Sequence, residues 1–189
     1  MMNIVFARTY TVGSGKWNDA RIWNGDYAGS TINAGDIVHI TGQVVISENV
    51  SINGVLQIDK GASIVGIKNL VITKSGFMLN NGTVVVKKII NGGTIYNNQM
   101  MEASADIDNW GVIENNNSMV AGNNFDIHAG NAGGVGGAYY VNNNINSVSS
   151  SAIGKNVDAF YGNAIDSLND MGESVLPDAP ALTANYLQH

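Results

Sequence analysis

Residues 70–93 read LVITKSGFMLNNGTVVVKKIINGG and show the repeat that organises this chain from residue 37 to residue 130. Short runs of β-forming residues alternate with turns of asparagine and glycine, and each repeat carries an isoleucine followed within four positions by a glycine. The isoleucines are Ile40, Ile58, Ile72, Ile90, Ile107 and Ile127, and the glycines are Gly42, Gly61, Gly76, Gly93, Gly111 and Gly130. Intervals of about 14–20 residues are too short for helical repeats and predict a solenoid of stacked β-coils.

We therefore predict an all-β fold, a single-stranded parallel β-helix with about 17–20 residues per coil and about six coils in this stretch. Inward Val, Ile and Leu side chains are expected to stack from coil to coil. The asparagine-rich corners are expected to form hydrogen-bonded ladders of side-chain amides, which stabilise the stack.

The repeat divides the chain into four predicted parts. Residues 1–8 are the remnant of an export signal or a first strand, because Val5-Phe6-Ala7 matches the small-residue pattern at a signal cleavage site. The other three parts are an N-terminal cap over 9–35, β-helix coils over 36–163 that become irregular from 131, and a C-terminal segment over 164–189. That last segment is expected to hold a short helix and a tail, which either caps the final coil or docks on a neighbouring molecule.

Composition argues against several classes of protein. Only 13% of residues are charged, the net charge is −6, and no basic cluster exceeds Lys87-Lys88, so nucleic acid is not an expected partner. There is no cysteine, which removes disulfides, thiolate metal sites and a cysteine nucleophile. No apolar run reaches the roughly 18 residues of a membrane-spanning helix, so no membrane span is expected.

Aromatic residues near the two ends of the solenoid are candidates for ligand binding. Trp17 and Trp23 either cover the first coil or form a stacking surface for carbohydrate, and both roles would use the same indoles. The remaining candidates for stacking on a sugar are Tyr139, Tyr140, Phe160 and Tyr161.

Acidic residues provide the only candidates for metal binding or catalysis. Asp106 and Asp108 share one face of a strand, as do Asp126 and His128 about one coil later, with Glu102 and Glu114 nearby in sequence. Such a patch could bind Ca²⁺ through oxygen ligands or supply two acids for glycoside cleavage. The opposing interpretation is that these are solvated coil corners, without a lysine or arginine to act as the base of a lyase. We predict no catalytic residue and no resident cofactor, with Ca²⁺ as the weak exception.

The N-terminal motifs carry a family resemblance. Gly15-Lys16-Trp17, then Trp23, then Ala34-Gly35-Asp36 before a Val/Ile strand resemble the opening of extracellular parallel β-helix repeat proteins common in Bacteroidetes. The proline that usually precedes the Gly-Asp step is absent, with Ile32-Asn33-Ala34 in its place. The resemblance implies a surface or secreted module, adhesive or structural in role, and does not imply one activity.

Three hypotheses of function follow. The first is a non-enzymatic, exported structural or adhesive module, extracellular or on the cell surface, that associates with itself head to tail or contacts extracellular polysaccharide. The second is a glycan-binding module that uses the terminal aromatic residues. The third is a polysaccharide lyase or hydrolase that uses Asp106, Asp108, Asp126 and Glu114.

Overall fold

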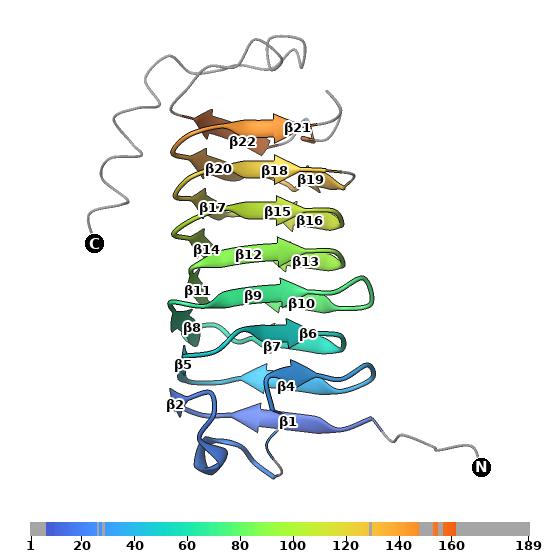
Figure 1. The fold of residues 1–189 in the computed structure, drawn as a ribbon, viewed down its shortest axis with the longest axis vertical. Helices are drawn as coiled ribbons and strands as arrows, with labels where there is room; N and C mark the ends of the chain where they lie inside the picture. Colours follow the sequence, from blue (N-terminus) through green and yellow to red (C-terminus); the bar gives the residue numbers. More distant parts are fainter. Residues whose placement is uncertain are drawn as a thin grey trace, which may run out of the picture.

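The computed structural model is a β-solenoid in which three parallel sheets run the length of the molecule (Figure 1). The structure describes residues 7–25, 27, 29–128, 130–147, 153–154 and 157–161. Within this part of the chain the sheets have seven, eight and seven strands, and we call them A, B and C. The predicted fold class is thereby confirmed. The predicted helix and tail over 164–189, and most of the segment 1–8, lie outside the described residues.

Each coil contributes one strand to each sheet in turn. Sheet A consists of β1 (Thr9–Val12), β4 (Ile37–Ile40), β7 (Val55–Ile58), β10 (Phe77–Asn80), β13 (Thr94–Asn97), β16 (Val112–Asn115) and β19 (Asn131–Gly133). Sheet B consists of β2 (Gly15–Lys16), β5 (Gln43–Ile46), β8 (Ser63–Gly66), β11 (Thr83–Val86), β14 (Met100–Ala103), β17 (Ser118–Ala121), β20 (Gly137–Val141) and β22 (Val157–Tyr161). Sheet C consists of β3 (Thr31–Ile32), β6 (Val50–Ile52), β9 (Asn69–Ile72), β12 (Lys88–Asn91), β15 (Ile107–Asn109), β18 (Phe125–Ile127) and β21 (Ile145–Ser147).

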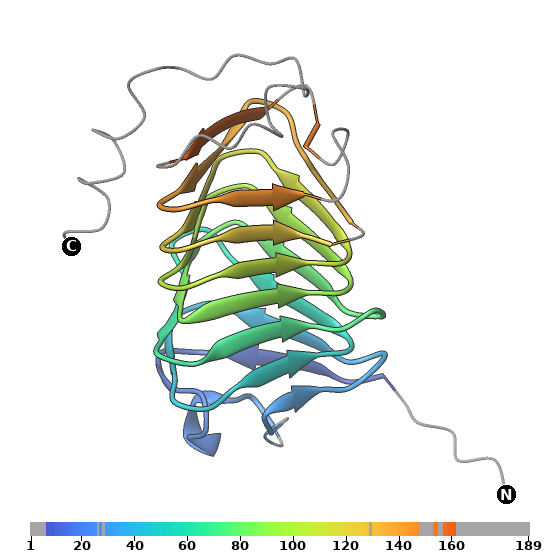
Figure 2. The same ribbon diagram turned by 45° about the horizontal axis from the view of Figure 1, so that its top comes forward.

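The core is built from columns of side chains that repeat once per coil. Alternate residues of a strand point to opposite faces, so one set of each strand enters the interior. One column in sheet A runs from coil to coil through fully buried side chains, which are Val38, Leu56, Met78, Ile95 and Ile113. Figure 2 shows the strands of successive coils stacked above one another on each side of the molecule. Each coil therefore packs its inward side chains against one another and against those of the neighbouring coils.

The isoleucine repeat proves not to be one column. Ile40 and Ile58 pair in sheet A, whereas the other four isoleucines lie in sheet C at three register positions. Ile90 faces outward opposite Asp108, while Ile107 faces the core. Coil length varies, because the coil from Val55 to its partner Phe77 is longer than the next coil, from Phe77 to Thr94. Equal spacing in sequence therefore does not preserve the register.

The glycines of the repeat behave differently, because four of them do stack. Gly76, Gly93, Gly111 and Gly130 occupy the corner that leads into sheet A. A Cβ atom on Gly93 would clash with the carbonyl oxygen of Gly76, and one on Gly111 would clash with that of Gly93. At this corner the backbones of successive coils approach too closely for any side chain, which explains the recurring glycine.

The predicted amide ladders are confirmed, and two of them are buried. In sheet A the side-chain Nδ2 of Asn80 donates to Oδ1 of Asn97 at 2.7 Å, and Asn97 donates to Asn115 at 2.8 Å. In sheet C, Asn91 donates to Asn109 at 2.8 Å. All five side chains have zero exposure, so these ladders lie inside the solenoid. A more exposed ladder, Asn81, Asn98 and Asn116, runs beside the first.

The first coil begins earlier than predicted. β1 pairs with β4, so residues 9–35 already supply a strand to each sheet and are not a separate cap before position 36. This first coil, from Thr9 to its partner Ile37, is longer than the second, from Ile37 to Val55. The extra length includes the 3-10 helix η1 (Ala20–Ile22).

Candidate functional site

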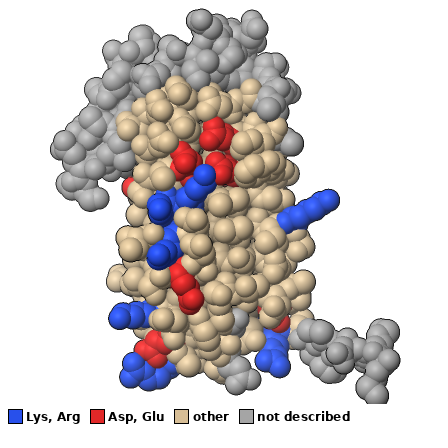
Figure 3. All heavy atoms as spheres, in the orientation of Figure 1, with Lys and Arg blue, Asp and Glu red and all other residues tan. Residues whose placement is uncertain are grey.

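Three aspartates gather on the outer face of sheet C. Asp108 of β15 and Asp126 of β18 are direct register partners on neighbouring coils. Asp106 immediately precedes β15, two residues before Asp108, and shares its outward direction. Figure 3 shows acidic side chains clustered with a basic one on the upper part of the face that sheet C presents to the viewer. The predicted proximity of these three carboxylates is therefore correct.

Lys88 lies within this cluster, contrary to the expectation that no basic residue would. Its Nζ is 2.7 Å from Oδ2 of Asp108 and 3.5 Å from Oδ2 of Asp106. Lys88 opens β12, which pairs with β15 of the following coil. The length of one coil thus brings the lysine beside both carboxylates.

The charges in this cluster stabilise one another. Burial disfavours the charged form of Lys88, but the hydrogen bond to Asp108 and the charges of both aspartates outweigh it and raise its pKa. Burial likewise opposes ionisation of Asp106, but hydrogen bonds from Asn123 and Asn124 and the charge of Lys88 outweigh it and lower the pKa of Asp106. At neutral pH Lys88 is an ammonium held between carboxylates, which is unsuited to accepting a proton.

The other acidic candidates form neither a metal-binding site nor a pair of catalytic acids with Asp106 and Asp108. Asp126 accepts a hydrogen bond of 2.6 Å from Nδ2 of Asn146. Glu102 lies on sheet B and Glu114 on sheet A, so neither joins the aspartates on sheet C, because the three sheets face different directions. Across the described ranges, no three His, Asp or Glu side chains are arranged to hold a metal ion.

An aromatic pair that the sequence interpretation missed lies beside the aspartates. Trp110 follows β15 and His128 follows β18, and their rings stack with centroids 3.9 Å apart and planes 9° apart. Trp110 is 46% exposed. The available signal was the spacing, because the step in sequence from Trp110 to His128 equals the step from Asp108 to Asp126. Trp110 is thus an exposed indole next to a charged cluster.

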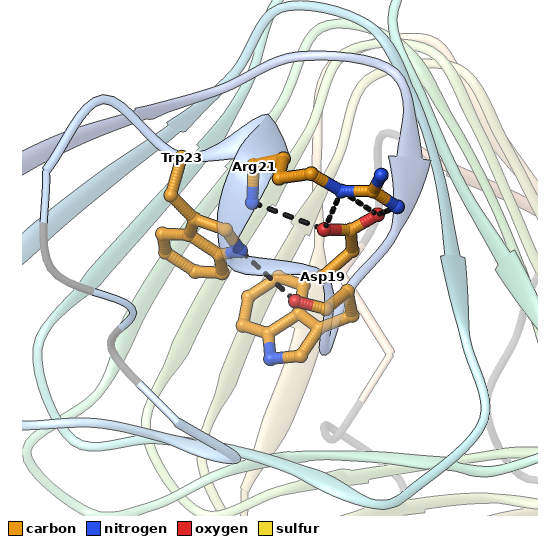
Figure 4. Close-up of polar contacts among 4 residues, drawn as sticks. Asp19, Arg21 and Trp23 are labelled. Atoms are coloured by element: carbon orange, nitrogen blue, oxygen red, sulfur yellow. Dashed lines mark hydrogen bonds and ion pairs between the residues drawn. The ribbon is translucent and has the colours of Figure 1, made fainter.

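The two N-terminal tryptophans prove unavailable for stacking on a sugar. Trp17 has zero exposure and Trp23 only 5%. Their rings meet edge to face with centroids 5.0 Å apart, and Nε1 of Trp23 donates to the carbonyl oxygen of Trp17 at 2.9 Å (Figure 4). Figure 4 also shows the Arg21 guanidinium against the carboxylate of Asp19, the residue that caps η1. Both indoles are core side chains, since inward burial leaves no ring face for a ligand.

Of the C-terminal aromatic candidates, Tyr139 is buried and Tyr140 faces outward. Tyr139 has zero exposure, packs on Phe125 with ring centroids 5.2 Å apart, and donates its hydroxyl to the carbonyl oxygen of Gly133. It is therefore a core residue and not a ligand-binding one. Tyr140, the next residue, faces outward from sheet B and is half-buried. The side chains of Phe160 and Tyr161 lie outside the described part of the structure.

A shallow depression of about 720 Å³ lies on the outside of sheet B near its first strands. The polar side chains around it are Ser14, Gln43, Ser63 and Thr83, and the larger apolar ones are Val45 and Val65. No ionisable side chain of the described residues lines it, so it offers hydroxyls and an amide but no acid or base.

In the part of the chain that the structure describes, no helix has the length and apolar character required to span a membrane. Comparisons of the chain with models of known protein families, with curated proteins and with solved structures found no match. The function of the protein is therefore inferred from its own sequence, fold and site.

Proposed function

We propose that this protein is a non-enzymatic β-helical module with a structural or adhesive role, exported to the cell surface or the extracellular space. The observation that carries the proposal is the pair of buried asparagine ladders. Side chains of Asn80, Asn97 and Asn115 bond to one another along the solenoid axis, in addition to the backbone hydrogen bonds of the sheets. Such coil-to-coil bonding favours a stiff rod, which suits a mechanical element.

The state of the charged cluster supports the non-enzymatic part of the proposal. Lys88, the basic residue of this cluster, is paired with Asp108 at 2.7 Å and has a raised pKa. Asp106 has a lowered pKa and accepts hydrogen bonds from Asn123 and Asn124. A general base needs a lower lysine pKa and a general acid needs a higher carboxyl pKa, so each shift runs against catalysis.

Export and surface location rest on the sequence. Two features support export and a surface location. One is the resemblance to surface β-helix proteins, carried by Gly15-Lys16-Trp17, Trp23 and Ala34-Gly35-Asp36. The other is the match of Val5-Phe6-Ala7 to the pattern at a signal cleavage site. Head-to-tail association is included in the proposal because the terminal strands of a solenoid are sheet edges, and a sheet edge can template a further strand. A heterologous contact of this kind does not close and produces fibres.

Concentration-dependent imaging tests the structural part of the proposal. Purified protein would be followed from micromolar to millimolar concentration by light scattering after size exclusion and by negative-stain microscopy. We expect rods that lengthen with concentration. Particles that remain monomeric at every concentration would rule out head-to-tail assembly into filaments. Incubation with neutral and acidic polysaccharides forms the second arm, and release of new reducing ends or unsaturated products would overturn the non-enzymatic assignment.

A further inference from the structure

The two faces of the Trp110 ring have different surroundings. Corner residues that follow sheet C form one column, Thr73, Gly92, Trp110 and His128, in which each backbone N–H donates to the coil before. His128 covers the face of the indole directed toward the next coil, at 3.9 Å between ring centroids. The other face is directed toward Gly92, which has no side chain. The indole is 46% exposed and therefore has a stacked ring on one side only within its column.

On the Gly92 side the column itself places no side chain against the indole, and the longer corner 73–76 of the coil before brings the backbone of Lys74 beside Gly92. Two strand spacings, roughly 9–10 Å, separate Trp110 from Thr73, the next residue of the column that has a side chain. The Cβ position of Gly92 has only ordinary contacts, the nearest being the carbonyl oxygen of Ile72 at 3.4 Å. No close backbone contact requires glycine here, in contrast to Gly93, where a Cβ atom would clash with the carbonyl oxygen of Gly76.

Polar groups border this space on the same face of sheet C. Asp108, two residues before Trp110 in sequence, lies on the outer face of sheet C as the register partner of Ile90 and Asp126. The carboxylate of Asp108 contacts Nζ of Lys88, which places one acceptor group and one donor group next to the indole. Ile90, the half-buried partner of Asp108 on the preceding coil, supplies an apolar base.

We propose that the outer face of sheet C at Trp110 is a binding subsite for a neutral polysaccharide. A sugar ring would stack its C–H face on the indole above Gly92, while its hydroxyl groups donate to Asp108 and accept from Lys88. Neutral chains are favoured over acidic ones because three carboxylates, Asp106, Asp108 and Asp126, lie on this face, and Lys88 is already paired with two of them. The subsite deepens the adhesive part of the proposed function, on which it rests, by naming the partner.

Four forms of the protein test this proposal against a soluble β-glucan, a xylan and a mannan, with a polyuronate as the acidic comparison. Trp110→Ala removes the stacking surface, whereas Gly92→Leu keeps the indole and fills the space beneath it. Tyr96→Ala is the matched control, because Tyr96 is 40% exposed but lies on sheet A. Calorimetry measures binding, and circular dichroism confirms that each variant retains its β-sheet content.

We expect the unmodified protein and Tyr96→Ala to bind one of the neutral polysaccharides with the same affinity. Both Trp110→Ala and Gly92→Leu should weaken that binding by about tenfold or more. Absence of binding, affinity that is equal in all four forms, or a preference for the polyuronate would each overturn the proposal. None of these outcomes changes particle length or assembly, so failure of the subsite and failure of the rod proposal are distinguishable.

Discussion

Nδ2 of Asn80 donates to Oδ1 of Asn97 at 2.7 Å, and the two residues are register partners on successive coils. The same column holds Ile40 and Ile58 in the earlier coils, so the interior changes at β10 from aliphatic to amide side chains. A single buried amide would leave polar groups unsatisfied, whereas a stacked series satisfies each donor with the acceptor of the next coil. The ladder is therefore stable only as a set.

Replacing the central residue of that ladder should destabilise the protein strongly. Asn97 donates to Asn115 and to the carbonyl oxygen of Ser118, and accepts from Asn80. We expect Asn97→Ala to lower the free energy of unfolding by about 2–4 kcal/mol, through lost bonds and a cavity. Asn98→Ala, in the more exposed ladder one residue later, should cost less than about 1 kcal/mol. Urea denaturation measures both variants. Equal losses of unfolding free energy in Asn97→Ala and Asn98→Ala would contradict the conclusion that the buried ladder stabilises the protein more than the exposed one.

Two adjacent glycines should differ in their tolerance of a methyl group. A Cβ atom on Gly93 would clash with the carbonyl oxygens of Gly76 and Thr73, whereas one on Gly92 meets its nearest neighbours at 3.4–3.7 Å. We expect Gly93→Ala to destabilise by about 3 kcal/mol, and Gly92→Ala to change stability by less than about 1 kcal/mol. Thermal unfolding of both variants measures the contrast, and similar melting temperatures would disprove the close approach of coils.

The Lys88 cluster should make stability depend on pH at both extremes. The lowered pKa of Asp106 contributes stability that is present above the ordinary carboxyl pKa and is lost as the pH falls through the folded value. The raised pKa of Lys88 contributes stability that is fully present below 10.5 and is lost as the pH rises through the folded value. The cluster therefore contributes fully around neutral pH.

Removal of the lysine checks this pH dependence. Lys88→Met should lower stability at pH 7 by about 1–2 kcal/mol, because Asp108 is only 9% exposed and loses its partner. In Lys88→Met the melting temperature should fall less steeply than in the unmodified protein, both as the pH rises into alkali and as it falls into acid. Lys87→Met alters the neighbouring exposed lysine and should leave both limbs of the pH profile unchanged. If the melting temperature depended on pH identically in all three proteins, the result would contradict the pairing of Lys88 with the aspartates.

Truncation of two tryptophans should lower stability by very different amounts. Trp17 has zero exposure and contacts Trp23, so Trp17→Ala should cost about 3–5 kcal/mol by leaving a cavity in the first coil. Trp110 is 46% exposed, so Trp110→Ala should cost less than about 1 kcal/mol. Acrylamide quenching provides a second readout, because loss of Trp110 should remove the accessible share of the fluorescence. A large loss of stability in Trp110→Ala would assign that residue to the core.

Much of the architecture could be predicted because contacts in a solenoid are one coil apart. The spacing of β-forming runs and Asn/Gly corners predicted the fold class and the amide ladders. It also predicted that Asp108 and Asp126 share a face, since one coil separates them. In each case a short distance in sequence corresponds to a short distance in space, which is the property of a one-dimensional repeat.

What only the tertiary structure decided is which side chains face inward and which share an outer face. Coils of unequal length shift the register, so the spacing of Trp17, Trp23 and Tyr139 did not reveal that they are buried. Lys88 beside Asp106 and Trp110 against His128 were missed for another reason, because both pairs have the same step in sequence as Asp108 and Asp126 and could have been read from it. A change of one residue at a corner reverses the direction of the side chains that follow, and that reversal turns a candidate ligand surface into core. The sequence by itself therefore determined the solenoid, and the register of its coils decided the surface.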